Sequence, residues 1–246
     1  MANDVSENDA HDLANLVFEH LAVSLSLTTN ALTPPLPPNS SKITIYATGS
    51  ARVVTRAALE AYLMFNYLFV SPKSADEREF RYLAYKITGL IERQSIPAVD
   101  PNNKKKLQYE SELIKELTAR LQSNNTFKGM KENEQRRIIK GNWRPPSWKT
   151  LIEEANLPPL VKMMYDHLCI YAHSKYTSVI QLATAYEKGE HQLLNNPMFS
   201  LFNIITARMI DDYCKVFPRT RDAIPASHQD TLNNWLQLIH GLMSEP

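Results

Sequence analysis

Glycine and cysteine are both scarce in this chain of 246 residues, which contains six glycines and two cysteines. So few glycines disfavour an all-β fold with many tight turns and leave little material for a dinucleotide-binding loop. Two cysteines, Cys169 and Cys214, are too few for a disulfide scaffold of this size. The formal net charge of +1 gives no global attraction to nucleic acid or to an acidic membrane.

Targeting signals and long apolar runs are also missing. The acidic, polar residues 1–12 do not resemble a signal or transit peptide. The longest apolar run, residues 57–70, includes Glu60 and Asn66 and is shorter than a membrane span. We therefore expect a cytoplasmic protein without a membrane partner.

Helical periodicity is what the chain has in abundance. Apolar residues recur with a period near 3.6 in almost every segment, and 15 prolines separate the segments. The pattern predicts an all-α fold, a single helical domain over 1–246 that is a bundle of about eight or nine helices with no significant sheet. The expected helices are 8–28, 43–70, 74–94, 102–123, 131–140, 148–156, 159–187, 197–217 and 226–243.

Two segments differ from the rest in composition. Residues 33–41, TPPLPPNSS, are predicted to form a Pro-rich loop between helices, with a PxxP ligand for an aromatic groove as the alternative. Residues 128–149 are predicted to form a basic linker between two helical halves, because they hold seven Lys and Arg against two Glu. With two tryptophans interleaved, this segment is also the best candidate for contacting a phosphate backbone, through Arg136, Arg137, Lys140 and Arg144.

A stripe of charge interrupts the otherwise apolar helix 43–70. Arg52, Arg56 and Glu60 are spaced four residues apart and therefore share one helical face. Charges on such a helix must be paired or must line a wet cleft. The stripe is either an anion-binding cleft or a buried ion network that fixes helix register.

The segment 159–187 carries the groups that we expect to face this stripe. His173 and Tyr165 are predicted to meet Glu60 or Arg56 across a helix interface, with Tyr171 as a further ligand-binding residue. His173 would then be a neutral hydrogen-bonding group or a proton carrier, and His173 with Glu60 is the candidate catalytic pair. The alternative is a hydrogen-bonded interior histidine.

A metal site is the weakest interpretation of the same helix. Asp166, Cys169 and His173 follow a D-x2-C-x3-H pattern, but the sequence offers no second pair of ligands at helical spacing. Motifs for nucleotide phosphates, zinc proteases and serine hydrolases are absent as well. We expect neither a metal nor a cofactor.

The order of these motifs resembles a known family. ARVVTRAALEAY at 51–62 is followed by Tyr82 and Tyr85, then by WKTLIEEANL at 148–157, and finally by Tyr165-x5-Tyr171-Ala-His173-Ser174. The order is similar, over about 43–180, to a bacterial all-helical family known only as a domain of unknown function. The resemblance implies a helical bundle that draws Arg56, Glu60, Tyr165 and His173 together.

That family is in turn loosely similar to HEPN domains, which are helical and are often ribonucleases or nucleotide binders. Their hallmark is an arginine, four to six residues, and a histidine. This chain matches it at Arg221 and His228, with Pro225 between them.

Two functions follow as hypotheses. The first is an interaction or regulatory module that binds an anionic ligand or partner through the Arg/Glu/Tyr/His cleft. The second is a HEPN-like, metal-independent ribonuclease or nucleotide-processing enzyme, with RNA or a nucleotide as partner. Whether the protein is an enzyme stays open. A homodimer formed through an exposed helical face at 201–210 is a further expectation.

Overall fold

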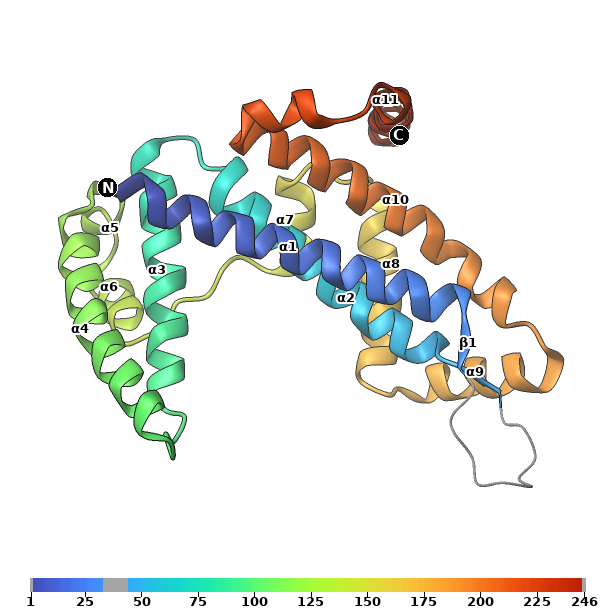
Figure 1. Cartoon of the computed structure of the whole chain (residues 1–246), viewed down its shortest axis with the longest axis horizontal. Helices are drawn as coiled ribbons and strands as arrows, with labels where there is room; N and C mark the ends of the chain where they lie inside the picture. Colours follow the sequence, from blue (N-terminus) through green and yellow to red (C-terminus); the bar gives the residue numbers. More distant parts are fainter. Residues whose placement is uncertain (1, 33–43, 245–246) are drawn as a thin grey trace. The chain divides into compact units, whose positions relative to one another are not determined.

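The fold is helical almost throughout. A computed structural model of the chain describes residues 2–32 and 44–244 (Figure 1). Eleven α-helices occur in these residues, and the only sheet there is a hairpin of two short strands, so the all-α prediction is confirmed. The Pro-rich segment 33–41 lies outside the described residues.

The chain divides into two compact units rather than one continuous core. Unit 1 comprises residues 1–66 and 148–246, and unit 2 comprises residues 67–147. The elements of unit 1 are α1 (Ala2–Thr29), β1 (Ala31–Leu32), β2 (Ile45–Tyr46), α2 (Thr48–Phe65), α7 (Trp148–Glu154), α8 (Pro159–Ala172), α9 (Tyr176–Lys188), α10 (His191–Val216), the 3-10 helix η2 (Pro218–Ala223) and α11 (Ala226–Ser244).

Helix α2 is the core of unit 1. It packs against α1, α7, α8, α9 and α10, and it lies along α1 in Figure 1. Ala51 and Ala58 are fully buried, and their small side chains let α1 approach closely. Ser24 of α1 donates to the carbonyl oxygen of Ala51 at 2.7 Å and lies 2.6 Å from the hydroxyl of Thr55, so polar groups inside this contact are satisfied.

Unit 2 is built around α3. The π-helix η1 (Asn66–Val70) continues directly from α2 and leads into the unit, whose other elements are α3 (Ala75–Gln94), α4 (Pro101–Ser123), α5 (Asn125–Lys128) and α6 (Glu132–Ile139). Helix α3 packs against α4, α5 and α6. Local sequence explains the helix starts, because the side chains of Ser74 and Asp100 accept first-turn amide hydrogens from Glu77 and Asn103.

Several expected helix boundaries were wrong, among them the start of α1, which lies at Ala2 rather than at residue 8. Residues 45–46 form strand β2, so α2 begins at Thr48 rather than at 43. The expected helix 159–187 is interrupted after Ala172, because Ser174 adopts a left-handed conformation with φ of 47°. The amide of Lys175 then donates to the carbonyl oxygen of Ile170, which closes the end of α8. Helix α10 begins at His191 and passes through Pro197 instead of starting there.

The basic segment 128–149 contains a packed helix as well as a connection. Helix α6 lies in it, with Ile138 buried and the helix packed on α3. Residues 140–147 then lead from unit 2 back to unit 1.

The helical face at 201–210, expected to be exposed for dimerisation, is buried instead. Leu201, Ile204 and Ile205 are each 1% exposed or less. The reason is that α10 packs against α1 and α2 within unit 1, so its apolar face is already covered.

One helix among the described residues, Thr48–Val70, is long and apolar enough to cross a membrane by composition alone. In this structure 67% of its apolar window is buried inside the protein. That burial accounts for its composition, since core helices are apolar on most sides.

Candidate anion-binding site

The candidate site lies where the end of α8 meets the middle of α2, in unit 1. Because α8 ends at Ala172, His173 caps it and its side chain is exposed. About two turns earlier on α8, Tyr165 faces Glu60 of α2. Four of the residues predicted from sequence, Arg56, Glu60, Tyr165 and His173, therefore lie together, and we call them the Arg56 cluster.

Glu60 is the anchor of the Arg56 cluster. Its Oε1 accepts a hydrogen bond from Arg56 Nε at 2.8 Å and another from the Tyr165 hydroxyl at 2.9 Å. The Arg56 guanidinium also lies over the Tyr165 ring, 5.6 Å from its centroid, at a distance that permits a cation–π interaction. Arg56 is thus held along one edge by a carboxylate and on one face by an aromatic ring.

The outer edge of Arg56 faces the histidine. Its Nη1 lies 3.4 Å from His173 Nε2, and among the side chains that the structure describes no acidic group pairs with Nη1 or Nη2. The side chains of Arg56 and Glu60 are 20% and 24% exposed, so water and solutes reach this edge. An arginine edge and an imidazole side by side form a set of nitrogen donors that suits the oxygens of a phosphate or carboxylate.

The electrostatics agree with a fixed cation at this position. Burial alone would lower the pKa of Arg56, but the hydrogen bond and the negative charge of Glu60 outweigh it and raise that pKa. Burial, followed by the same carboxylate, raises the pKa of Tyr165 well above its usual value. Tyr165 therefore stays a neutral donor, and Arg56 stays charged.

A second Arg–Glu–Tyr arrangement in unit 2 shows what sets Arg56 apart. Arg81 pairs with Glu77 at 2.6 Å and lies 3.9 Å from the Tyr67 ring centroid. Its Nη1, however, donates to the Tyr67 carbonyl oxygen at 2.8 Å and to Ser71 Oγ at 2.9 Å. The Nη1 of Arg81 is therefore used internally, whereas that of Arg56 faces an exposed imidazole.

Arg52 does not join the Arg56 cluster. It is 1% exposed, and its guanidinium donates to the carbonyl oxygens of Thr48 and Leu194 and to Asn195 Oδ1. It lies 4.6 Å from the centroid of Tyr171, the other predicted ligand-binding residue, which is also buried. Arg52 and Tyr171 therefore join α2 to the start of α10 instead of facing solvent.

Burial leaves Arg52 in an unusual state. Its Nε has no hydrogen-bond partner, and no carboxylate in the described part of the chain pairs with it. Burial lowers the pKa of Arg52, opposed by the Tyr171 phenol. The charge is compensated by carbonyl dipoles and by the Tyr171 ring instead of a carboxylate, which makes this residue a structural cation.

A second polar network, which was not predicted from the sequence, lies in the core of unit 1. Asp212 is fully buried and accepts hydrogen bonds from the Tyr62 hydroxyl at 2.9 Å, Asn66 Nδ2 at 2.8 Å and Lys215 Nζ at 2.8 Å. Asn66 follows Tyr62 by four residues, and Asp212 follows Arg208 by four, so helical spacing was the available signal. Because Asp212 of α10 is fully buried and bonded to Tyr62 of α2, this network fixes α2 against α10.

The residues of the metal-site and HEPN-motif hypotheses lie as follows in the structure. Asp166 accepts a hydrogen bond from Lys149 at 2.8 Å, and the described residues contain no group of three or more His, Cys, Asp or Glu placed to hold a metal ion. Arg221 pairs with Asp211 at 2.8 Å on η2, while His228 lies beyond Pro225 on α11.

The candidate nucleic-acid contacts all lie in unit 2 and are exposed. Arg136 pairs with Glu132 on α6, and Arg137, Lys140 and Arg144 are open to solvent. Trp143 lies 6.1 Å from the Tyr67 ring centroid and so packs on the unit instead of standing free.

Fold and site together define an all-helical protein with an arginine–glutamate–tyrosine–histidine cluster on its surface. Comparison with known families shows that residues 45–190 match the model of a family of unknown function, DUF5677. The chain belongs to this family, and the matched residues include the whole Arg56 cluster. No curated protein and no solved structure matched the chain.

Proposed function

We propose that this protein is an interaction or regulatory module that binds an anionic ligand or partner through Arg56 and His173. The observation that supports it is the 3.4 Å approach of Arg56 Nη1 to His173 Nε2 at an exposed position. Glu60 and Tyr165 serve as positioning residues, because they fix the guanidinium before the ligand arrives. The free thiols of Cys169 and Cys214 support the cytoplasm as its compartment.

Calorimetric titration tests this proposal with a panel of inorganic phosphate, adenosine monophosphate, a short RNA and an acidic peptide. We expect saturable binding of at least one of them, weakened about tenfold or more in Arg56→Gln and in His173→Gln. Arg81→Gln is the matched control, because it removes an arginine held in the same way by Glu77 and Tyr67. Equal binding by all variants would place the ligand elsewhere, and no binding by the wild type would refute the module.

A second candidate function is a HEPN-like, metal-independent ribonuclease or nucleotide-processing enzyme. The same contact favours it, because an imidazole next to a cation can move a proton while the cation stabilises phosphate charge. The exposed arginines and lysine of 136–144, in unit 2, are separate candidate contacts for an RNA backbone. Incubation with labelled RNA in EDTA separates the two functions. If the wild type cuts the RNA and His173→Ala does not, the result supports the enzyme. If the RNA stays intact at every protein concentration, the interaction module is the function that is supported.

A further inference from the structure

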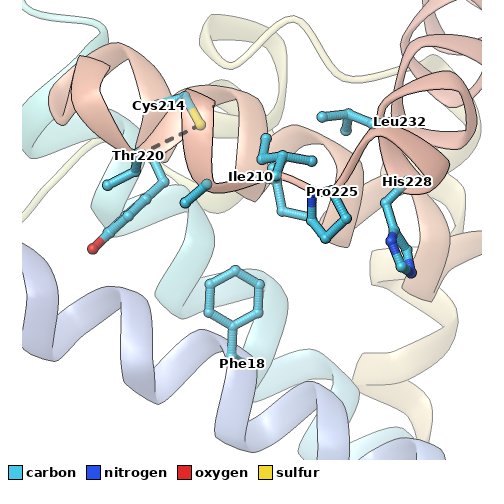
Figure 2. Close-up of a pocket in the computed structure, with 10 residues that line it drawn as sticks. Phe18, Ile210, Cys214, Thr220, Pro225, His228 and Leu232 are labelled. Carbon is cyan, nitrogen blue, oxygen red and sulfur yellow. Dashed lines mark hydrogen bonds between the residues drawn. The ribbon is translucent and has the colours of Figure 1, made fainter.

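A hollow in unit 1 shares no residue with the Arg56 cluster. It lies among α1, α10, η2 and α11 and has a volume of about 420 Å³. Figure 2 shows Phe18 of α1 opposite the side chains of Ile210, Cys214 and Pro225. Sites for small molecules usually measure about 300–1,000 Å³, so the hollow has the size of such a site.

The walls of the hollow are apolar in effect. The Tyr213 hydroxyl is hydrogen-bonded to His11 Nδ1 at 2.5 Å. The Thr220 hydroxyl donates to the Phe217 carbonyl oxygen at 2.7 Å and lies 3.6 Å from Cys214 Sγ (Figure 2). Because these hydroxyl groups already have hydrogen-bond partners in the protein, the walls favour contact with the hydrocarbon part of a ligand.

The mouth of the hollow has the opposite character. His228 lines it and is exposed, and its Nδ1 lies 3.2 Å from Ser227 Oγ. Its Nε2 has no hydrogen-bond partner among the described residues. The same histidine stands in the first turn of α11, which has 19 residues and no acidic residue in that turn. A helix N-terminus carries a partial positive charge, so the mouth favours a negative group.

From this combination we propose that the hollow binds a small amphiphilic acid, namely a medium-chain or aromatic carboxylic acid. The hydrocarbon part lies between Phe18 and Ile210, and the carboxylate meets His228 at the start of α11. Charge complementarity selects this occupant, because a neutral or cationic molecule with the same apolar part leaves the positive mouth without a partner.

Calorimetric titration of the full chain with decanoate, below its micellar concentration, tests the proposal against decanol, which has the same chain without the charge. We expect one saturable site for decanoate. Ala223 lines the hollow and is exposed, so Ala223→Trp should fill the space and weaken binding of both molecules about tenfold or more. His228→Ala should weaken decanoate about fivefold and leave decanol unchanged.

Two control variants keep the result specific. Asn233→Trp places the same bulky side chain on an exposed position of α11 that does not line the hollow, and His240→Ala removes another histidine from that helix. Both should bind decanoate like the wild type, and unchanged thermal unfolding of each variant confirms folding. The proposal is overturned if decanoate shows no saturable binding, if Ala223→Trp binds it normally, or if His228→Ala weakens decanol and decanoate equally.

Discussion

Arg52 and Arg56 lie one turn apart on α2, yet they occupy opposite environments. Arg52 is 1% exposed and donates to carbonyl and amide oxygens of α2 and α10. Arg56 is 20% exposed and pairs with Glu60, with its outer edge towards His173. Two arginines on one helical face therefore have different roles: Arg52 is a structural cation and Arg56 is an accessible one. Substitutions should separate the effect on stability from the effect on binding.

Arg52→Met should destabilise unit 1 strongly. The substitution leaves the amide oxygen of Asn195 without its donor in the core and removes the side-chain hydrogen bonds to the helical carbonyl oxygens of Thr48 and Leu194. Hydrogen bonds from a charged donor contribute about 1.5–3 kcal/mol each, and packing of the methionine offsets part of the loss. We expect the free energy of unfolding in urea to fall by about 3 kcal/mol. An unchanged midpoint would show that the carbonyl oxygens find water instead.

Glu60→Ala should be mild by comparison. Its pair with Arg56 spans one turn and both side chains are about a fifth to a quarter exposed, so solvent screens the interaction. Together with the lost partner of Tyr165, the loss should be about 1 kcal/mol in the same urea titration. A loss of about 3 kcal/mol or more, as expected for a buried ion network, would contradict the assignment of the Arg56 cluster as an accessible site.

Asp212 should prove more important for folding than its tyrosine partner. Asp212→Asn removes a fully buried negative charge that faces the buried cation of Arg208, whereas Lys215 keeps its pair with Asp211, so the unfolding free energy should fall by about 3 kcal/mol. Tyr62→Phe deletes one hydrogen bond and leaves Asn66 on the same carboxylate oxygen, so it should fall by only about 1 kcal/mol. Thermal unfolding of both variants checks this order, and equal losses would contradict it.

Alkaline pH should destabilise the protein through its buried phenols. Burial and neighbouring carboxylates raise the pKa of both Tyr62 and Tyr165 above the ordinary value of 10.0. The unfolded chain therefore loses these protons first, and the stabilisation is complete below about pH 10 and is lost as the pH rises above it. Unfolding free energies measured across this range should fall for the wild type and fall less steeply for the Tyr62→Phe, Tyr165→Phe double variant.

Contacts within the Arg56 cluster could be predicted from the sequence where the signal was local. Arg56 and Glu60 at four-residue spacing define their own contact, and helical periodicity indicated the face of α8 that carries Tyr165. Arg52 belongs to the same stripe but points to α10. No local pattern reveals this, because its partners on α10, the Leu194 carbonyl oxygen and the Asn195 side-chain oxygen, are about 140 residues away.

Other features were missed for equally physical reasons. The end of α8 depends on Ser174 in a left-handed conformation, and the sequence offers neither glycine nor proline there as a signal. The Asp212 network joins residues about 150 positions apart, so its components looked like ordinary helical polar residues. The division into two units depends on which helices pack together and is not encoded in any single segment.

The most direct test of the central claim follows the imidazole of His173 itself by nuclear magnetic resonance during titration with inorganic phosphate and with adenosine monophosphate. If Arg56 and His173 bind an anion, the His173 ring resonances should shift saturably in the wild type and in Arg81→Gln, and should shift far less in Arg56→Gln. Ring resonances that stay unmoved by both phosphates, or that move equally in Arg56→Gln, would contradict a phosphate-binding role for this pair.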